Sequence, residues 1–246
     1  MKVLISGITG HMGKILSDMI SQDNDLEVTC GVSKNQNDTN IKCFHSFSDI
    51  NVDVDIVVDF SHHSLTKEMV DFAIKKNIAL VIATTGQTDD EKKIIKEASN
   101  TIPIFFASNY SMGIATLIES AKQVASRFKN ADIEIVETHH NRKLDAPSGT
   151  ALKIAESLKG VRPDANLVLG RSGNTKREKN DICISSIRLG NVVGIHEVLI
   201  STEHECISLK HEAYDRRLFA EGAINAIKFM NGKPKGFYTM DDMINI

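Results

Sequence analysis

Residues 2–13 read KVLISGITGHMG, and this stretch decides the fold. A short apolar run leads into Gly7, Gly10 and Gly13, which are spaced as G-x-x-G-x-x-G. In a strand–loop–helix unit, such glycines let the backbone approach a pyrophosphate, and the helix N-terminus supplies N–H donors and the positive end of its dipole. The stretch therefore predicts a dinucleotide-binding loop, and a simple tight strand–helix turn is the alternative.

Short apolar runs alternate with amphipathic stretches from this loop to residue 107. The apolar runs are rich in β-branched residues, as buried strands are. Asp89 or Asp90 is placed to cap the last helix of the series. Strands that alternate with helices predict a parallel, doubly wound α/β sheet of the Rossmann-like kind. We expect strands over residues 2–6, 26–32, 55–60, 79–84 and 102–107, and helices over residues 14–21, 65–76 and 89–99.

The pattern changes after residue 109. Polar residues 164–180 indicate a mobile surface loop. The three β-rich segments that follow are joined by short turns such as Gly190-Asn191, which predicts antiparallel pairing between neighbours. The second half is therefore expected to be α+β, with an open mixed or antiparallel sheet. We expect helices over residues 112–128, 148–158 and 215–229, and strands over residues 132–138, 182–189, 193–202 and 206–211.

Composition limits the class of protein. A chain of 246 residues suits two domains, and a net charge of −3 without tryptophan argues against nucleic-acid binding. The sequence has neither an apolar run of membrane-spanning length nor a visible signal peptide, so a cytoplasmic location is expected. The cysteines form no C-x-x-C pair, which predicts reduced thiols and no metal site; they are Cys30, Cys43, Cys183 and Cys206.

The second strand bears on the choice of cofactor. It ends without the Asp or Glu that usually holds the ribose of NAD, and Ser33 and Lys34 follow it instead. These two side chains suit the 2′-phosphate of NADPH, which is favoured, while use of NADH stays open. Two later strand ends are expected to line the same crevice, although each is also compatible with a turn. They are Ala83, Thr84 and Thr85, and Ala107, Ser108, Asn109 and Tyr110.

Residues 137–151 read ETHHNRKLDAPSGTA and concentrate positive charge in an acidic protein. His139, His140 and Lys143 lie in one polar loop. The loop leads to a helix start at which Ser148 can cap and the N–H groups of Gly149 and Thr150 point outward. A carboxylate or phosphate would bind there, and His139, His140 and Lys143 could exchange protons with it. A solvated loop with incidental histidines is the alternative.

The same residues resemble a known signature. Residues 137–151 match every fixed position of E-x-H-H-x-x-K-x-D-A-P-S-G-T-A, which is typical of the dihydrodipicolinate reductase (4-hydroxy-tetrahydrodipicolinate reductase) family. Residues 7–13 resemble the G-x-x-G-x-M-G loop of that family. The resemblance spans nearly the whole chain, because further motifs follow in the expected order. They lie at residues 59–61, 84–86, 109–113, 188–190, 194–196 and 216–223.

The resemblance implies a domain plan and a reaction. Residues 1–109, joined by residues 216–246, would form the dinucleotide-binding domain. Residues 110–215 would bind substrate and form a homotetramer through an open sheet. NAD(P)H would reduce a cyclic, unsaturated dicarboxylate derived from 4-hydroxy-tetrahydrodipicolinate to tetrahydrodipicolinate, a step of lysine and diaminopimelate biosynthesis. Another NAD(P)-linked dehydrogenase and a dinucleotide-sensing binding protein are the competing hypotheses.

The resemblance also implies roles for single residues. His139 resembles a proton donor or acceptor and Lys143 a proton donor, and which of them acts in the chemical step stays open. His140 matches a substrate-binding position, and the backbone of Gly149 and Thr150 matches a clamp on a substrate carboxylate. This chain departs from many members at Ser33-Lys34, where they carry an acid, and at Ala83, where they carry glycine. Contacts to the cofactor are implied for Gly7, Ile8, Thr9, Gly10, His11 and Met12.

Overall fold

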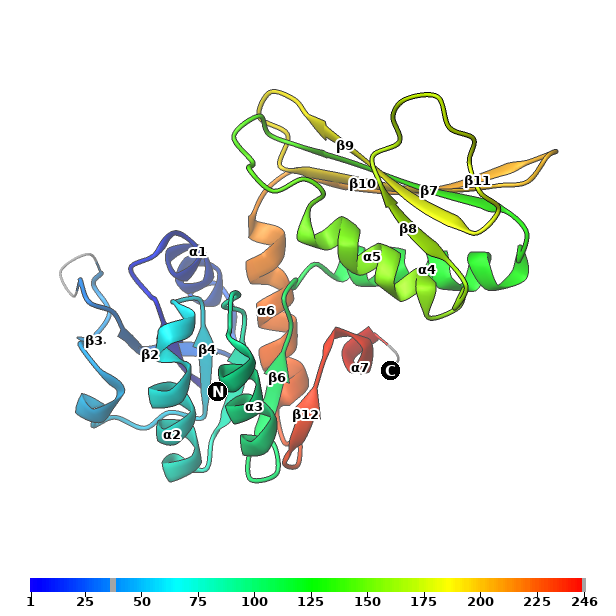
Figure 1. Cartoon of the computed structure of the whole chain (residues 1–246). Helices are drawn as coiled ribbons and strands as arrows, with labels where there is room; N and C mark the ends of the chain where they lie inside the picture. The colour runs from blue at the N-terminus through cyan, green and yellow to red at the C-terminus, as the bar shows by residue number, and fades with distance from the viewer. Residues whose placement is uncertain (36–38, 245–246) are drawn as a thin grey trace. The chain divides into compact units, whose positions relative to one another are not determined.

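The computed structural model describes residues 1–35 and 39–244. The chain forms two compact units, one of Met1–Ser111 with Arg217–Ile246 and the other of Met112–Arg216 (Figure 1). The sequence placed the domain boundaries after residues 109 and 215, within two residues of these divisions. The roles of the two units in binding cofactor, substrate and partner subunits remain predictions.

The first unit is built on a parallel sheet with the strand order β12-β6-β5-β4-β1-β2-β3. This order contains the 3-2-1-4-5-6 arrangement of Rossmann folds, so the prediction of a doubly wound sheet is confirmed. Its strands are β1 (Lys2–Ser6), β2 (Glu27–Val32), β3 (Cys43–Phe44), β4 (Ile56–Asp59), β5 (Ala79–Ile82), β6 (Pro103–Phe106) and β12 (Gly236–Tyr238). Its helices are α1 (His11–Ile20), α2 (Thr66–Lys76), α3 (Asp89–Ala98), α6 (Arg217–Met230) and α7 (Met240–Ile244).

The central strands of this sheet are buried, as continuous apolar runs predict. Leu4, Val57 and Leu80 have no exposed surface and pack in one cluster with α2 and α3, while α1 packs beside α6. The sequence did not predict β3, β12 or α7. These elements have two, three and five residues, which is too short for a hydrophobic period to develop.

The cap of α3 differs from the prediction by one residue. Thr88, not Asp89 or Asp90, is the N-cap, and its hydroxyl accepts from the backbone N–H of Glu91 at 3.2 Å. The Glu91 carboxylate in turn accepts from the backbone N–H of Thr88 at 2.7 Å. This reciprocal capping box satisfies two backbone donors at once, whereas an aspartate cap satisfies one. The two aspartates lie in the first turn instead.

The second unit holds a mixed sheet in the order β11-β10-β7-β9-β8, as the fold class predicts. Its strands are β7 (Asp132–His139), β8 (Asn166–Leu169), β9 (Asp181–Arg188), β10 (Gly194–Ser201) and β11 (Cys206–Ala213). Antiparallel pairing of β10 with β11 is confirmed. Direct pairing of β9 with β10 is wrong, because β7 lies between them, parallel to β9 and antiparallel to β10. The short turn after β9 therefore passes the end of β7, where Leu189 N donates to the carbonyl of His139 at 2.8 Å.

Helices α4 (Met112–Arg127) and α5 (Gly149–Lys159) cover one face of this sheet (Figure 1). Ile118 and Ile154 from the helices share a core with Ile135 and Val198 from the strands. Burial along β10 alternates strictly between buried and half-buried residues. The opposite face of the sheet is therefore left without a helical layer, as the term open sheet implies.

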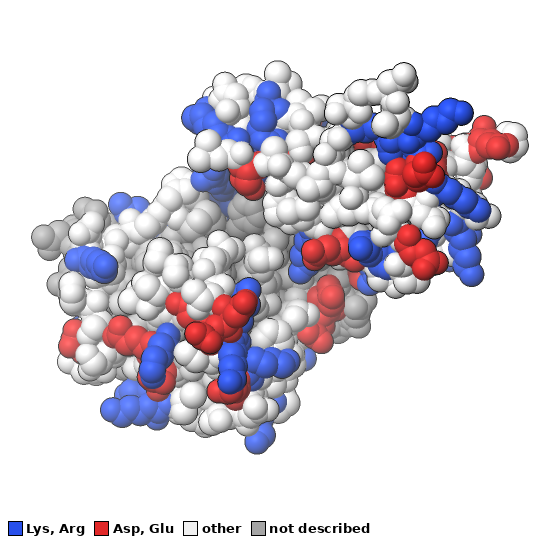
Figure 2. Space-filling model, in the orientation of Figure 1, with Lys and Arg blue, Asp and Glu red and all other residues white. Residues whose placement is uncertain are grey.

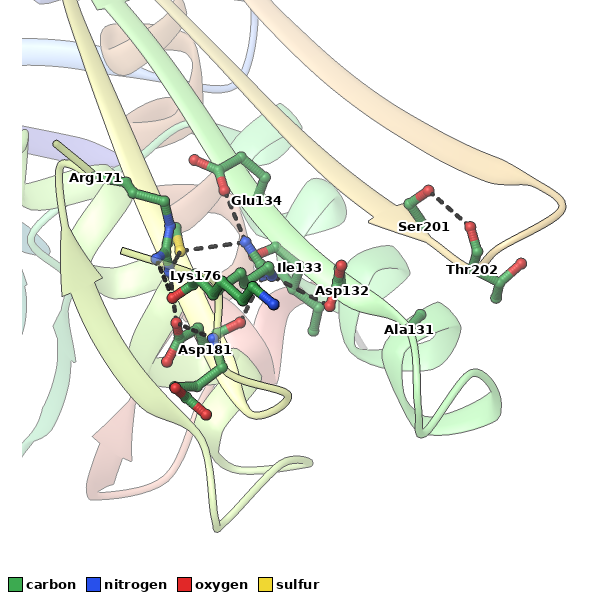
Figure 3. A network of polar contacts seen from close by, with 12 residues as sticks. Ala131, Asp132, Ile133, Glu134, Arg171, Lys176, Asp181, Ser201 and Thr202 are labelled. Atoms are coloured by element: carbon green, nitrogen blue, oxygen red, sulfur yellow. Dashed lines mark hydrogen bonds and ion pairs between the residues drawn. The ribbon is translucent and has the colours of Figure 1, made fainter. Parts of the chain in front are cut away.

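The prediction of an irregular loop over residues 164–180 is wrong in part. Asn166–Leu169 form β8, which pairs in parallel with β9. Two arginines attach the rest of the segment to the sheet. Arg171 pairs with Asp181 at 2.5 Å and donates to the carbonyl of Lys176 at 3.0 Å (Figure 3). Arg177 pairs with Glu134 of β7 at 3.1 Å. The sequence gave no sign of the two ion pairs, because Asp181 lies on β9 and Glu134 on β7.

The four cysteines are free thiols, as their spacing predicts. Acidic and basic side chains are intermixed on the face drawn in Figure 2, in keeping with a net charge of −3. Within residues 1–35 and 39–244, no three His, Cys, Asp or Glu side chains gather so as to hold a metal ion. Over the same residues, no helix combines the length and the apolar character needed to cross a membrane.

Candidate functional site: a glycine cradle and a histidine–carboxylate cluster

The glycine loop is packed so tightly that two of its positions admit no side chain. Gly7 has a φ of +81°, and a Cβ there would lie 2.6 Å from the carbonyl oxygen of Phe60. A Cβ on Gly13 would lie 2.2 Å from the carbonyl oxygen of Gly7. Helix α1 therefore begins directly against the end of β1, with backbone rather than side chains at its start.

The start of α1 has the character of an anion site. Gly10 is the N-cap, with an extended backbone and no side-chain cap hydrogen bond, and the first turn carries no acidic residue. Backbone N–H groups and the helix dipole thus face a position without a local counter-charge. A dinucleotide pyrophosphate fits such a cradle.

The end of β2 is joined to this loop. Thr9 Oγ1 lies 2.5 Å from Ser33 Oγ, and Gly7 N donates to the carbonyl of Val32 at 2.8 Å. Lys34 follows as an exposed side chain. The two residues predicted to meet a 2′-phosphate therefore lie next to the loop predicted to hold the pyrophosphate.

Several predicted cofactor residues have buried side chains that pack or form hydrogen bonds within the protein. Ile8 is 1% exposed and covers Gly31, where a Cβ would lie 2.4 Å from its Cγ2 atom. Tyr110 is 2% exposed and donates its hydroxyl to the carbonyl of Ile82 at 2.9 Å. Thr84 is buried and accepts from Ser61 N at 2.9 Å. Such residues can offer a cofactor only backbone atoms.

The other predicted cofactor residues differ in exposure. Ala107 is buried, and Asn109 accepts from Ser111 N at 2.8 Å. Those with exposed or half-exposed surface are Gly7, Thr9, Gly10, His11, Met12, Ser33, Lys34, Ala83, Thr85, Ser108 and Asn109. They all follow the carboxyl ends of parallel strands, which share one edge of the sheet.

Asp59 is a residue of this edge to which the sequence gave no role of its own. It ends β4, is 1% exposed, and accepts from Ser61 N at 3.2 Å and Ser61 Oγ at 2.5 Å. Burial raises the pKa of Asp59 above its ordinary value, although these hydrogen bonds act in the opposite direction. The carboxyl thus fixes the turn after β4, next to the turn after β1.

The second unit gathers ionisable side chains around Glu137 of β7. The Glu137 side chain has no exposed surface. Its Oε2 lies 2.5 Å from Nδ1 of His139 and 3.0 Å from Nη1 of Arg188, and its Oε1 lies 2.9 Å from Nη2 of Arg188. Burial by itself raises the pKa of Glu137, but hydrogen bonds from Arg188 and His139 bring that pKa below its ordinary value. The carboxylate is therefore ionised, and it accepts hydrogen bonds from both His139 and Arg188.

His196 of β10 completes the cluster from the other side. It is 4% exposed, its Nε2 lies 3.2 Å from Ser148 Oγ, and its ring meets that of His139 edge-on at 5.1 Å between centroids. Burial, reinforced by the nearby His139, lowers the pKa of His196 to about 4. His196 is therefore neutral at physiological pH.

The predicted cluster spans the end of β7 and the turn after it: His139 is the last residue of the strand, not a loop residue, and His140 and Lys143 follow. Lys143 N donates to the carbonyl of His140 at 3.1 Å, and Lys143 Nζ pairs with Asp145 at 2.8 Å. Desolvation and the charges of neighbours such as Arg142 lower the pKa of His140. The turn is held to the segment after β9, where Asn141 N donates to the carbonyl of Gly190 at 3.1 Å.

The start of α5 has an open approach. Ser148 is the N-cap, as predicted, and accepts from Ala151 N at 3.2 Å. Gly149 is exposed, and a Cβ there would meet nothing within 4 Å. Thr150 follows as a half-exposed residue. The first turn contains no acidic residue, so this helix N-terminus can accept a carboxylate.

Sequence reasoning gave Glu137, Arg188 and His196 no role, although each lies in a stretch that resembles a family motif. Arg188 and His196 are 51 and 59 residues from Glu137 along the chain, and only the strand order brings all three together. The available signal was the charge of Glu137 and Arg188 within segments that were otherwise predicted as strands. A charge in such a place needs a partner.

The chain matches two family models. That described as "Dihydrodipicolinate reductase, N-terminus" matches residues 1–110, and that described as "Dihydrodipicolinate reductase, C-terminus" matches residues 113–244. The 4-hydroxy-tetrahydrodipicolinate reductase of Clostridium tetani is 40% identical, covering 99% of this chain and 97% of the relative. That of Caldanaerobacter subterraneus subsp. tengcongensis is also 40% identical, covering 99% and 98%.

A solved structure supports the fold. The dipicolinate-bound dihydrodipicolinate reductase from Paenisporosarcina sp. TG-14 superposes with a TM-score of 0.81 at 23% identity, and 97% of each chain is covered. The likeness therefore extends over both units of the fold.

Proposed function

Because the chain belongs to the dihydrodipicolinate reductase family, we propose that its first unit holds a reduced nicotinamide dinucleotide and its second unit a cyclic dicarboxylate. The protein is an NAD(P)H-dependent oxidoreductase of lysine and diaminopimelate biosynthesis. It reduces the dehydrated form of 4-hydroxy-tetrahydrodipicolinate to tetrahydrodipicolinate. The observation that carries the proposal is the cluster in which His139, a cationic turn and an open helix N-terminus lie within one short segment.

In the first unit, we assign the pyrophosphate to the backbone of residues 7–12. The glycine positions that exclude a Cβ support this, and so does the absence of a side-chain cap on α1. Ser33 and Lys34 supply a hydroxyl and a cation for a 2′-phosphate, so NADPH is the preferred cofactor and NADH an alternative one. Ala83, Thr85, Ser108 and Asn109 line the same edge of the sheet. When bound, the nicotinamide supplies the hydride.

In the second unit, the substrate carries two carboxylates. We assign one of them to His140 and the backbone N–H groups of Gly149 and Thr150, next to the cation of Lys143. Dipicolinate, the ligand in the Paenisporosarcina structure, is a planar dicarboxylate of the same kind. It is therefore a suitable probe for this site.

Reduction of a conjugated imine or enamine consumes one proton for each hydride. We assign the delivery of this proton to His139 or Lys143. His139 is oriented through Nδ1 by Glu137, which leaves Nε2 for exchange. Lys143 carries its charge beside Asp145. Either residue can donate, and the other then stabilises the negative charge of the substrate.

A coupled assay tests the proposal. Dihydrodipicolinate synthase, pyruvate and aspartate semialdehyde generate the substrate, and oxidation of NADPH or NADH is followed by absorbance. Substrate-dependent oxidation, with a higher kcat/KM for NADPH, is the expected result. Absence of substrate-dependent oxidation with both cofactors would contradict the reductase function and favour a dinucleotide-sensing protein.

We further propose that the protein works in the cytoplasm as a homotetramer. The sheet of the second unit leaves one face without helices, and Ile187, Ile195 and Leu199 lie on it with partial exposure. A sheet face of this kind can pack against its own copy. Light scattering during gel filtration should give four times the chain mass of 27.1 kDa, and a monomer would contradict the assembly.

A further inference from the structure

We propose that Glu137 is a positioning residue that fixes the ring of His139 and the start of α5 through one shared carboxylate. The kinetic part of this inference rests on the proposed reductase function, and the geometric part stands without it. A carboxylate that both orients an imidazole and anchors a binding helix would couple proton delivery to substrate binding.

Both carboxylate oxygens of Glu137 accept two hydrogen bonds each. Oε2 receives His139 Nδ1 at 2.5 Å and Arg188 Nη1 at 3.0 Å. Oε1 receives Arg188 Nη2 at 2.9 Å and the backbone N–H of Ser148 at 3.1 Å. Four donors therefore converge on a side chain without exposed surface, which leaves the carboxylate no freedom to rotate.

These bonds determine the state of His139. An ionised carboxylate can only accept, so in the neutral ring the proton lies on Nδ1 and the lone pair on Nε2. Nε2 lies on the side of Gly194, where a Cβ would come within 3.2 Å of it. The ring is thus held in one tautomer and one orientation. Because Gly194 has no side chain, no Cβ crowds Nε2.

The same carboxylate anchors α5. The backbone N–H of Ser148, the N-cap of α5, donates to Glu137 Oε1, and the Ser148 hydroxyl meets His196 Nε2 at 3.2 Å. The helix start that is proposed to hold a substrate carboxylate is therefore tied to the atom group that orients His139. A shift of Glu137 would move both.

Arg188 balances the buried charge. It donates from both Nη1 and Nη2 to Glu137 and also donates to the carbonyl of Asp145, which follows the cationic turn. Replacing Glu137 alone would leave this guanidinium without its counter-charge, so the fold itself could be weakened. A test must therefore separate loss of folding from loss of positioning.

The variants are Glu137→Gln, and Glu137→Gln combined with Arg188→Met, which removes both charges of the pair. Glu156→Gln is the matched control, because Glu156 is an exposed glutamate of α5 in the same unit. The readouts are kcat and KM in the coupled assay, the melting temperature, and ¹⁵N shifts of labelled histidine, with His139 assigned by loss of its signal in His139→Gln.

In the unsubstituted protein we expect a proton on His139 Nδ1, so that only Nε2 gains or loses one. In Glu137→Gln, kcat should fall about 10²-fold or more and KM for the dicarboxylate should rise, because both the His139 ring and the start of α5 lose an anchor. KM for NADPH should change less than about twofold, because the cofactor is assigned to the first unit. The ¹⁵N shifts should show a mixture of tautomers. The double variant should recover the melting temperature but not kcat, and Glu156→Gln should leave kcat unchanged.

Three results would overturn the inference: an Nδ1 without a proton in the unsubstituted protein, unchanged kcat in Glu137→Gln, or recovery of kcat together with the melting temperature in the double variant. The ¹⁵N measurement needs no turnover. An inactive unsubstituted enzyme would therefore refute the proposed reductase function, while the tautomer would still decide the role of Glu137.

Discussion

Two helix N-termini of this molecule suit anions, and they are built in opposite ways. At the start of α1, a Cβ on Gly13 would lie 2.2 Å from a backbone oxygen; at the start of α5, a Cβ on Gly149 would meet nothing within 4 Å. The first site is a close-packed backbone cradle without an acidic side chain in the first helical turn. The second is an open helix end surrounded by ionisable groups from β7, β9 and β10. The cradle is therefore suited to holding a cofactor, and the ionisable cluster to moving a proton.

The largest expected effect tests whether the chemistry lies in the second region alone. Lys143→Ala should lower kcat by about 10²–10⁴-fold, the range for loss of a proton donor, while the Kd for NADPH changes less than about twofold. Steady-state kinetics and a cofactor titration measure the two quantities. Lys153→Ala is the control, since Lys153 is an exposed lysine of α5. Weakened cofactor binding with normal kcat at saturating substrate would contradict the assignment of the proton chemistry to the second region.

The two helix starts can be compared directly by adding one methyl group to each. Gly13→Ala should weaken dinucleotide binding at least tenfold and destabilise the fold by about 1–3 kcal/mol, because the backbone of the loop must move. Gly149→Ala should leave stability unchanged or raise it by up to about 1 kcal/mol, since alanine favours a helix over glycine. Its KM for substrate should rise if a carboxylate binds there. Urea unfolding and NADPH titration measure both variants, and equal destabilisation would refute the contrast.

The buried histidine of the second region should make stability depend on pH. The pKa of His196 is about 4 in the fold against an ordinary 6.5, so between these values the unfolded chain binds a proton that the folded chain does not. The free energy of unfolding is therefore highest above pH 6.5 and falls as the pH decreases. One proton bound only by the unfolded chain costs about 1.4 kcal/mol per pH unit, so the loss between pH 6.5 and pH 5 is about 2 kcal/mol.

Urea unfolding at pH 7.5 and pH 5 checks this expectation. The pKa of His140 and that of His211 are lowered too, so they add in the same direction. His196→Gln should flatten the pH dependence, and His204→Gln, at an exposed histidine near the sheet edge, should not. An unchanged slope in His196→Gln would show that other groups are responsible.

The smallest expected effect concerns cofactor preference in the first region. Lys34→Ala should raise the KM for NADPH about fivefold, as expected for an exposed charge contributing about 1 kcal/mol, and leave that for NADH unchanged. Parallel assays with both cofactors measure the difference. A matched change in both KM values would mean that Lys34 does not contact the 2′-phosphate.

The sequence predicted much of the fold because its signals are local. The hydrophobic period gave β1, α1, α2 and α4 to within a few residues, and the Ser148 cap was predicted from its position before the helix. The failures share one cause. The pairing of β9 with β10 was wrong because β7, more than forty residues earlier in the chain, lies between them. Residues 166–169 were predicted as loop because only pairing with β9 makes them a strand.

The candidate site divides in the same way. The glycine spacing and the cluster of His139, His140 and Lys143 were visible in the sequence, because each lies within one short segment. The carboxylate contacts of Glu137 with Arg188, and the place of His196, depend on three strands meeting. Their side chains had to be buried together before their charges could be assigned to one another.

By itself, then, the sequence determined a parallel α/β unit with a glycine loop, an α+β unit with a mixed sheet, and the chemical types gathered after β7. Only the tertiary structure decided that Ile8 and Tyr110 are core side chains, that Glu137 is the shared partner of His139 and α5, and that His196 is buried and neutral. The physical reason is that backbone sites are specified by neighbours in the chain. Buried charges are specified by neighbours in space, which burial forces into pairs.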